Sequence, residues 1–232
     1  MRYYKFIMAD GKTPEGYGAW DLPKDGKPGA WMIAKPGPME ECHDTAVHIL
    51  RADQLRNWIA PHALLWEVKP QGKVVNVGNK CICKKARILR QVPGWTRETG
   101  WEALCKIVER SFENLPAGET KPQAAIATLR KWLKGGATGE DLRRAAAAAY
   151  AVYADYVPYT YAYAAYAAVY AAYAAADAAR YAAAATYNAT DAARYAAATA
   201  ADAARYAAAY ADEKEEQTRI ICRAAGITGG GR

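Results

Sequence analysis

The chain has 232 residues, of which 52% are hydrophobic and 24% charged, with five cysteines and a formal net charge of +7. This composition supplies a sizeable core and excludes wholesale disorder. The odd cysteine count, without disulfide-like spacing or an uninterrupted apolar run near the start, argues against a secreted disulfide scaffold. No stretch is long and apolar enough for a conventional membrane span. We therefore expect a cytoplasmic protein with no membrane partner.

The positive charge lies in the first part of the chain. Residues 1–135 carry 22 basic and 14 acidic side chains, whereas residues 136–232 carry 9 and 10. A basic excess attracts phosphates or acidic proteins. The densest basic run, 83–87, is short, so a solvated surface is favoured, and nucleic-acid binding by the basic N-terminal half remains an alternative.

Residues 1–93 are punctuated by Gly and Pro clusters at 13–16, 25–29 and 35–38, which set turns between short elements. Alternating apolar residues predict strands at 3–8, 63–68, 73–77 and 85–92. Residues 52–59 predict one short helix, with Leu55, Trp58 and Ile59 on one face. This segment is expected to be a small α+β domain.

Helical periodicity begins after Pro93-Gly94. It predicts helices at 102–114 and 123–134, and a third that starts at 138–141, where Thr138 precedes two acids. From 145 to 211 the chain is low in complexity, with 37 Ala and 14 Tyr among 67 residues. Ala favours helix, and breaks are expected at Pro158 and near 186–191. The fold class is α+β: a strand-rich domain over 1–93, an all-α domain over 96–226 and a flexible tail over 227–232.

The unit Asp-Ala-Ala-Arg-Tyr recurs three times in this tract, at 177–181, 191–195 and 202–206. Steps of 14 and 11 residues return to nearly the same helix face. Arg and Tyr are enriched at interface hot spots, so the stripe is a candidate surface for a protein partner. The interpretation that we favour over partner binding is a solvent-exposed face of Asp and Arg side chains beside a core packed with Tyr. The candidate partner-binding residues are Arg180, Tyr181, Arg194, Tyr195, Arg205 and Tyr206.

Nucleotide-binding and hydrolase motifs are missing from the sequence, and we expect no cofactor. Cys81 and Cys83 could share a metal ion with Cys42 or His43 from a facing segment. Zinc sites use CxxC rather than CxC spacing, so buried apolar cysteines are the better interpretation and no metal is expected.

A weak catalytic alternative pairs His48 with Glu67 as general acid and base, if their strands face each other. A Glu at a strand end also invites comparison with ADP-ribosyltransferases, but no convincing nicotinamide-anchoring Arg precedes it. His48 lies in an apolar run and is more simply explained as a hydrogen-bonded structural residue. An enzyme is therefore not the favoured prediction.

The order of several motifs resembles a family of bacterial and phage-borne proteins that join a small α+β domain to an Ala-rich helical tail. The resemblance is in the segments 10–14, 20–23, 27–31, 47–51, 65–68, 85–90 and 212–221. It covers nearly the whole chain and implies an architecture without a biochemical activity.

Residues 115–150 partly resemble immunity proteins of bacterial polymorphic toxin systems, through Lys121-Pro122-Gln123, Arg130 and Trp132 before an Ala-rich helix. Those proteins often carry His where this tail has Tyr, and they lack the N-terminal domain. The two resemblances favour a non-enzymatic, protein-binding protein of phage or prophage-like character, with a role in immunity, anti-defence or phage structure.

Overall fold

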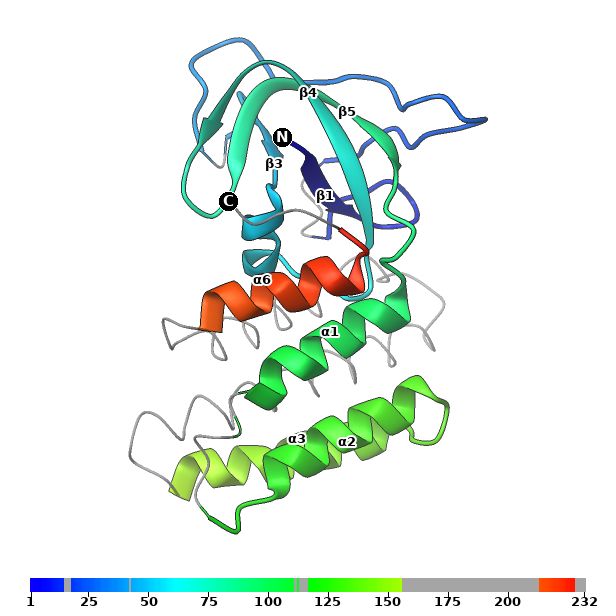
Figure 1. Cartoon of the computed structure of the whole chain (residues 1–232), viewed down its shortest axis with the longest axis vertical. Coiled ribbons are helices and arrows are strands. Elements are labelled where there is room, and N and C mark those ends of the chain that lie inside the picture. The colour runs from blue at the N-terminus through cyan, green and yellow to red at the C-terminus, as the bar shows by residue number, and fades with distance from the viewer. Residues whose placement is uncertain (15–17, 42, 111, 113–116, 156–212, 228–232) are drawn as a thin grey trace.

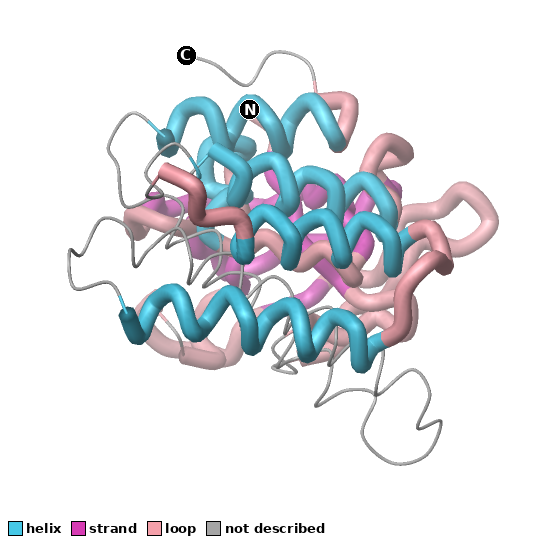
Figure 2. Tube along the Cα trace, turned by 90° about the horizontal axis from the view of Figure 1, so that it is seen from below, coloured by secondary structure: helices cyan, strands magenta, loops and turns pink. Residues whose placement is uncertain are grey.

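The computed structural model describes residues 1–14, 18–41, 43–110, 112, 117–155 and 213–227 (Figure 1). They form a mixed α+β structure in which an antiparallel sheet lies at one end and a stack of helices at the other, as Figure 2 shows from the helical end. The strands are β1 (Tyr3–Ile7), β2 (Met32–Ile33), β3 (Val47–Ile49), β4 (Leu64–Asn76) and β5 (Cys81–Gln91). The helices are the 3-10 helix η1 (Ala52–Asn57) and the α-helices α1 (Arg97–Glu109), α2 (Lys121–Leu133), α3 (Gly139–Asp155) and α6 (Glu213–Ala224).

The sheet closes on itself into a small barrel. β4 pairs with β1 on one side and with β5 on the other, and the free edge of β5 pairs with both β3 and β2. Leu50, just after β3, exchanges backbone hydrogen bonds of 2.7 and 2.8 Å with Tyr4 of β1. This single bridge brings the two ends of the sheet together at Tyr4 and Leu50.

β4 is longer than the sequence suggests. We expected two strands here, at 63–68 and 73–77, and Pro70 and Gly72 between them are residues that weaken strand interiors. That prediction is wrong: one strand spans the segment, with register shifts against β5 between Glu67 and Val68 and between Gln71 and Val74. Gly72 adopts a φ of 84° at the second shift, a conformation that favours glycine. The irregularities bend both long strands, as Figure 1 shows, and the bend closes the barrel.

Two buried clusters fill the molecule. The first lies inside the barrel and contains Ile7, Trp20, Val47, Ile49, Trp66, Val68, Cys81, Cys83, Ala86 and Ile88. The second lies between the barrel and the helices, and it includes Phe6 and Leu65 from the strands, Leu55 from η1 and Leu104 from α1. Alternate residues of β1 and β4 thus face different cores, as strand geometry requires.

The helices follow the predicted order with shifted ends. α1 begins at Arg97, five residues before the predicted start, because Thr96 caps it: its hydroxyl accepts from the Thr99 amide at 3.2 Å, and Thr99 accepts from the Thr96 amide at 2.7 Å. α2 begins with Pro122 in its first turn, where a missing N–H costs nothing. α2 packs against both α1 and α3. None of the helices among the described residues is long and apolar enough to cross a membrane.

α6, from the end of the chain, packs against η1 and α1, next to the barrel (Figure 1). Its Ile221 belongs to the same buried cluster as Leu55 and Leu104, and Ile227 packs against that cluster. A Cβ on Gly94 would lie 2.6 Å from the backbone of Ala225. The joint expected at Pro93-Gly94 is therefore packed against α6, and one core extends across it. The division into domains at 1–93 and 96–226 stays a prediction.

Arg130 of α2 connects two carboxylates of α1. Its guanidinium lies 2.8 and 3.0 Å from the oxygens of Glu102 and 2.9 Å from Glu109, and a further nitrogen also contacts Glu109. Hydrogen bonds to Glu109 and Glu102 raise the pKa of Arg130. Bidentate pairs of this kind are among the stronger ionic contacts.

We expect Arg130→Met to lower the free energy of unfolding by about 2 kcal/mol, because it leaves two half-buried carboxylates without their partner. Urea denaturation measures this loss. The control is Arg143→Met, which removes an exposed pair with Glu140 three residues away and should cost less than about 0.5 kcal/mol. Equal losses in the two variants would contradict the prediction.

Candidate functional site

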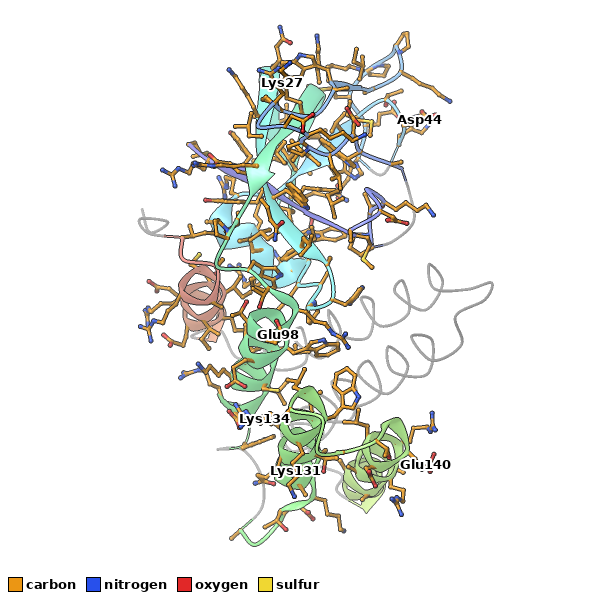
Figure 3. All side chains as sticks on the ribbon, turned by 90° about the vertical axis from the view of Figure 1, so that its right-hand side faces the viewer. Lys27, Asp44, Glu98, Lys131, Lys134 and Glu140 are labelled. Carbon is orange, nitrogen blue, oxygen red and sulfur yellow. The ribbon has the colours of Figure 1, made fainter. Side chains whose placement is uncertain are left out.

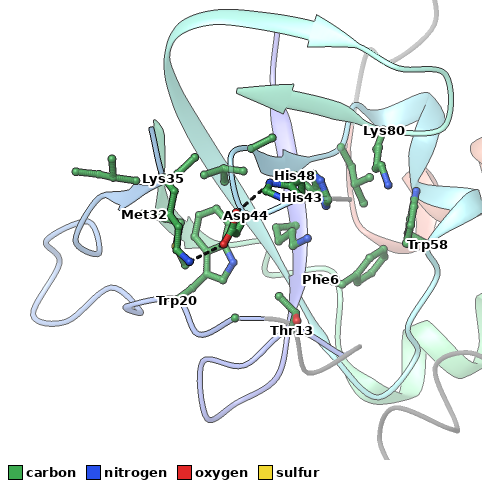
Figure 4. Close-up of a pocket in the computed structure, with 17 residues that line it drawn as sticks. Phe6, Thr13, Trp20, Met32, Lys35, His43, Asp44, His48, Trp58 and Lys80 are labelled. Carbon is green, nitrogen blue, oxygen red and sulfur yellow. Dashed lines mark ion pairs between the residues drawn. The ribbon is translucent and has the colours of Figure 1, made fainter. Parts of the chain in front are cut away.

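A cavity of about 860 Å³ opens beside β1 and β3 and is bordered by Thr13, Gly18 and Trp20 and by residues 32–35 and 43–46 (Figure 4). Pockets that combine an apolar wall with a few polar groups are the usual form of small-molecule sites. The lining residues are Lys5, Phe6, Thr13, Gly18, Trp20, Met32, Ile33, Ala34, Lys35, His43, Asp44, Ala46, Val47, His48, Leu50, Trp58 and Lys80.

Aromatic rings form the walls at both ends of the cavity. Figure 4 shows Trp20 at one end and Phe6 and Trp58 at the other. Phe6 is held by an edge-to-face contact with Trp95 at 5.3 Å between centroids. The indole N–H of Trp58 donates to the carbonyl of Asn79 at 2.8 Å, which fixes its ring beside the turn after β4. These rings are therefore positioned by the fold before any ligand binds.

Lys80 is the most buried cation of the cavity, with only 4% of its side chain exposed. Its ammonium lies 3.1 Å from a carboxylate oxygen of Glu41 and 5.0 Å from the centroid of the Trp58 ring. A buried ammonium needs such partners to offset its lost hydration. Lys5 of β1 adds a second cation to the lining.

Lys35, His43 and Asp44 form a charged group at the mouth of the cavity (Figure 4). The two oxygens of Asp44 lie 2.6 Å from Nζ of Lys35 and 3.0 Å from Nδ1 of His43. The hydrogen bond from Lys35 lowers the pKa of Asp44, and the same bond raises the pKa of Lys35. Asp44, the one carboxylate among the described residues of the lining, is thus already engaged by two basic side chains.

Thr13 is a buried residue of the cavity wall, only 3% exposed. Its hydroxyl oxygen is buried without a hydrogen-bond partner among the described residues. Because this oxygen has almost no accessible surface, Thr13 closes the wall without offering a donor to a ligand.

His48 lies on β3, half-buried, with its side chain directed to the cavity beside His43 (Figure 4). Burial, together with the nearby Lys5 and Lys80, lowers the pKa of His48 to about 4, although Glu41 acts in the opposite direction. The imidazole is consequently neutral at pH 7, and the positive charge of the cavity comes from lysines.

Stability should fall in acid because of His48. An unfolded His binds a proton near pH 6.5, whereas the folded side chain resists protonation until about pH 4. The unfolded state therefore binds more protons in this window, and stability decreases as pH falls from 6.5 to 4. Because water screens a half-buried group, we expect a contribution of about 1–2 kcal/mol.

Urea denaturation of the wild type and of His48→Gln over this pH range measures the contribution as a difference between two slopes. The variant should lose about 1–2 kcal/mol less stability between the two ends of the window. A wild-type slope in His48→Gln would overturn the assignment.

Glu67, the proposed catalytic partner of His48, lies elsewhere. It sits on β4 opposite Tyr4 of β1, accepts from Arg90 at 2.8 Å and does not line the cavity. β1 separates its strand from β3, since Tyr4 pairs with Glu67 on one side and with Leu50 on the other. The structure thus brings His48 together with Lys5, Lys80 and Glu41, and it does not bring His48 to Glu67.

Cys81 and Cys83 are buried on β5, as the sequence predicts. The thiol of Cys83 approaches the carbonyl of Val47 at 3.7 Å, and burial raises its pKa to about 11. The thiol of Cys81 lies 3.5 Å from the side-chain oxygen of Gln54. Within the described ranges, no three His, Cys, Asp or Glu residues form a group that could hold a metal ion.

The six candidate residues of the Ala/Tyr tract, Arg180 to Tyr206, lie outside the described residues. Their role stays a prediction. Sequence reasoning considered His48 and His43 for catalysis or metal binding, and it missed the cavity that they share with Lys80 and Trp58.

Comparison with known proteins gives no match: no family model, curated protein or solved structure is significantly similar to the chain. The resemblances to phage-borne and immunity proteins therefore stay predictions.

Proposed function

We propose that this protein is a binding protein whose barrel takes up a small organic anion with an aromatic or otherwise apolar body. The observation that supports this most is the placement of Lys5 and Lys80 in one cavity with the rings of Phe6, Trp20 and Trp58. The lysines would pair with the acidic group, and the rings would cover the apolar part.

The charge balance of the lining favours an anion over a cation. Among the described residues, three lysines line the cavity against a single carboxylate, Asp44, which already pairs with Lys35 and His43. Glu41 neutralises part of the charge on Lys80, and His48 contributes none at pH 7. An acidic ligand would meet a positive potential that low-dielectric walls strengthen.

A matched pair of fluorescent probes tests the proposal. 1-Anilinonaphthalene-8-sulfonate carries an anionic group on an aromatic body, and N-phenyl-1-naphthylamine has the same rings without the charge. We expect one sulfonate probe to bind per chain, about tenfold more tightly than the neutral probe, which corresponds to about 1.4 kcal/mol. Equal affinities would contradict the choice of an anion.

Charge variants locate the binding site. Lys5→Gln and Lys80→Gln should each weaken the sulfonate probe about tenfold and leave the neutral probe within about twofold. Lys12→Gln, which removes an exposed lysine outside the lining, is the control. Thermal melting of each variant shows whether it is folded. Wild-type binding of the sulfonate probe by both folded cavity variants would overturn the proposal.

Protein binding by the Ala/Tyr tract is the second candidate function. Arg144 and Asp141, at the start of α3 just before the Ala-rich tract, form a pair with the same three-residue spacing as the repeated Asp and Arg. If the helical structure continues through the tract, the repeated Asp and Arg residues would form weak surface pairs of the same kind. Their arginine side chains would then be accessible to a protein partner. The partner's identity, the phage or immunity role and the cytoplasmic location belong to this proposal.

A further inference from the structure

The outer face of the barrel carries a cluster of cations on β4 and β5. Ala86 and Ile88 face the interior core, so the alternating Lys85 and Arg87 face outward. Val68 also faces inward, which places Lys69 on the same outer face, directly opposite Arg87 in the strand register. We call Lys69, Lys85 and Arg87 the basic face.

The basic face lacks acidic partners. None of the ion pairs among the described residues includes any of its three side chains. Nε of Arg87 is buried without a hydrogen-bond partner in the same part of the chain. Like charges directly opposite each other destabilise a sheet. Two cations directly opposite each other, without an acidic partner among the described residues, suit an anionic partner.

Trp31 adds an aromatic ring to this face. It precedes β2, which pairs with β5 so that Met32 lies beside Ala86. The ring centroid of Trp31 lies 4.8 Å from Nζ of Lys85 and 4.6 Å from the guanidinium carbon of Arg87. Trp31 as a residue is half-buried, so part of its surface stays accessible. None of these residues lines the cavity, and the face is thus a separate site.

We propose that the basic face binds single-stranded nucleic acid, with Lys69, Lys85 and Arg87 along the phosphates and Trp31 stacked on a base. Cations that follow a backbone beside an aromatic ring are the pattern by which proteins bind single strands without sequence preference. A duplex would offer phosphates but no accessible base for Trp31. An acidic protein would offer carboxylates and likewise no base.

Fluorescence anisotropy with a labelled oligothymidine of about 20 nucleotides tests this on the full chain. We expect binding that weakens steeply with salt, and at least about tenfold weaker binding in Lys85→Gln/Arg87→Gln. Removing two phosphate contacts should also lower the salt slope by about 1–2. The control, Lys106→Gln/Lys131→Gln, removes the same charge from the helices; Figure 3 places Lys131 at the end of the molecule away from the barrel.

Trp31→Ala separates stacking from charge. It should weaken oligothymidine binding about fivefold or more with an unchanged salt slope, and leave binding of a poly-glutamate peptide unaffected. If the double variant is unfolded by thermal melting, Lys69→Gln replaces it, since Lys69 is exposed. The proposal is overturned if the helical control weakens oligothymidine binding as much as Lys85→Gln/Arg87→Gln, or if the protein binds duplex DNA more tightly than oligothymidine. It is also overturned if poly-glutamate binds as tightly as oligothymidine and Trp31→Ala changes neither affinity.

Discussion

Trp101→Ala is expected to lower the free energy of unfolding by about 3–5 kcal/mol, the range for deleting a fully buried large side chain. Trp101 is 0% exposed in α1, and its ring makes an edge-to-face contact with Trp132 of α2 at 6.1 Å between centroids. Alanine would therefore leave a cavity at the junction of two helices. Urea or guanidinium denaturation followed by far-ultraviolet circular dichroism measures the loss.

Trp101→Phe is the matched variant. The indole Nε1 of Trp101 is buried without a hydrogen-bond partner among the described residues, so phenylalanine removes an unsatisfied donor while it keeps an aromatic ring. We expect a loss of about 1 kcal/mol, much smaller than that of alanine. Similar losses of unfolding free energy in the two variants would contradict the prediction. They would mean that the ring contact with Trp132 contributes little and that the volume of the side chain at position 101 does not determine stability.

The helices could be predicted because their signal is local. Residues 123–134 show one apolar face and end at Gly135-Gly136, and α2 spans Lys121–Leu133. The strands are less local. β2 and β3 contain two and three residues. Neither is among the four strands predicted from apolar patterning, although the suggested pairing of His48 with Glu67 assumed a strand at His48. Segments this short become strands only through pairing with β5. The closure of the barrel through Tyr4 and Leu50 has no sequence signature for the same reason.

The predicted helix at 52–59 shows how tertiary contacts modify a local pattern. Its apolar spacing was correct, since Leu55 and Ile59 are buried and Trp58 is partly buried. The segment is nevertheless a 3-10 helix that ends at Asn57. Gln54 donates from its side chain to Asn76 and to the Gly78 carbonyl, and thereby ties this short turn to the end of β4. Such long-range bonds decide the helix type and are not visible in the pattern.

The cavity was beyond sequence reasoning because its residues come from segments far apart in the chain. Lys80 follows β4, Trp58 follows η1, and Thr13 and Trp20 lie in an early loop. Each of these residues, taken alone in the sequence, could equally be an ordinary surface or core residue. They indicate a binding site only when the fold brings the cations and the aromatic rings together. The basic face differs: residues 83–87 were noticed as the densest basic run, but pairing with β4 adds Lys69 to them.

Ile221→Ala, the second large effect, tests whether the end of the chain stabilises the barrel. Ile221 is 0% exposed and shares a buried cluster with Phe6 of β1 and Leu65 of β4. We expect a loss of about 2–4 kcal/mol, as for other deletions of a buried aliphatic side chain. Ile220→Ala, at a neighbouring half-buried position, should cost about 1 kcal/mol and is the control.

Amide hydrogen exchange then shows which elements depend on α6. If one core joins the barrel and the helices, Ile221→Ala should lower protection in β1, β4 and α1 together, because these elements open as one cooperative unit. Faster exchange confined to α6 would mean instead that α6 docks on an independently stable barrel. That outcome would favour the division near Pro93-Gly94, since a domain that keeps its protection without α6 has a sufficient core of its own.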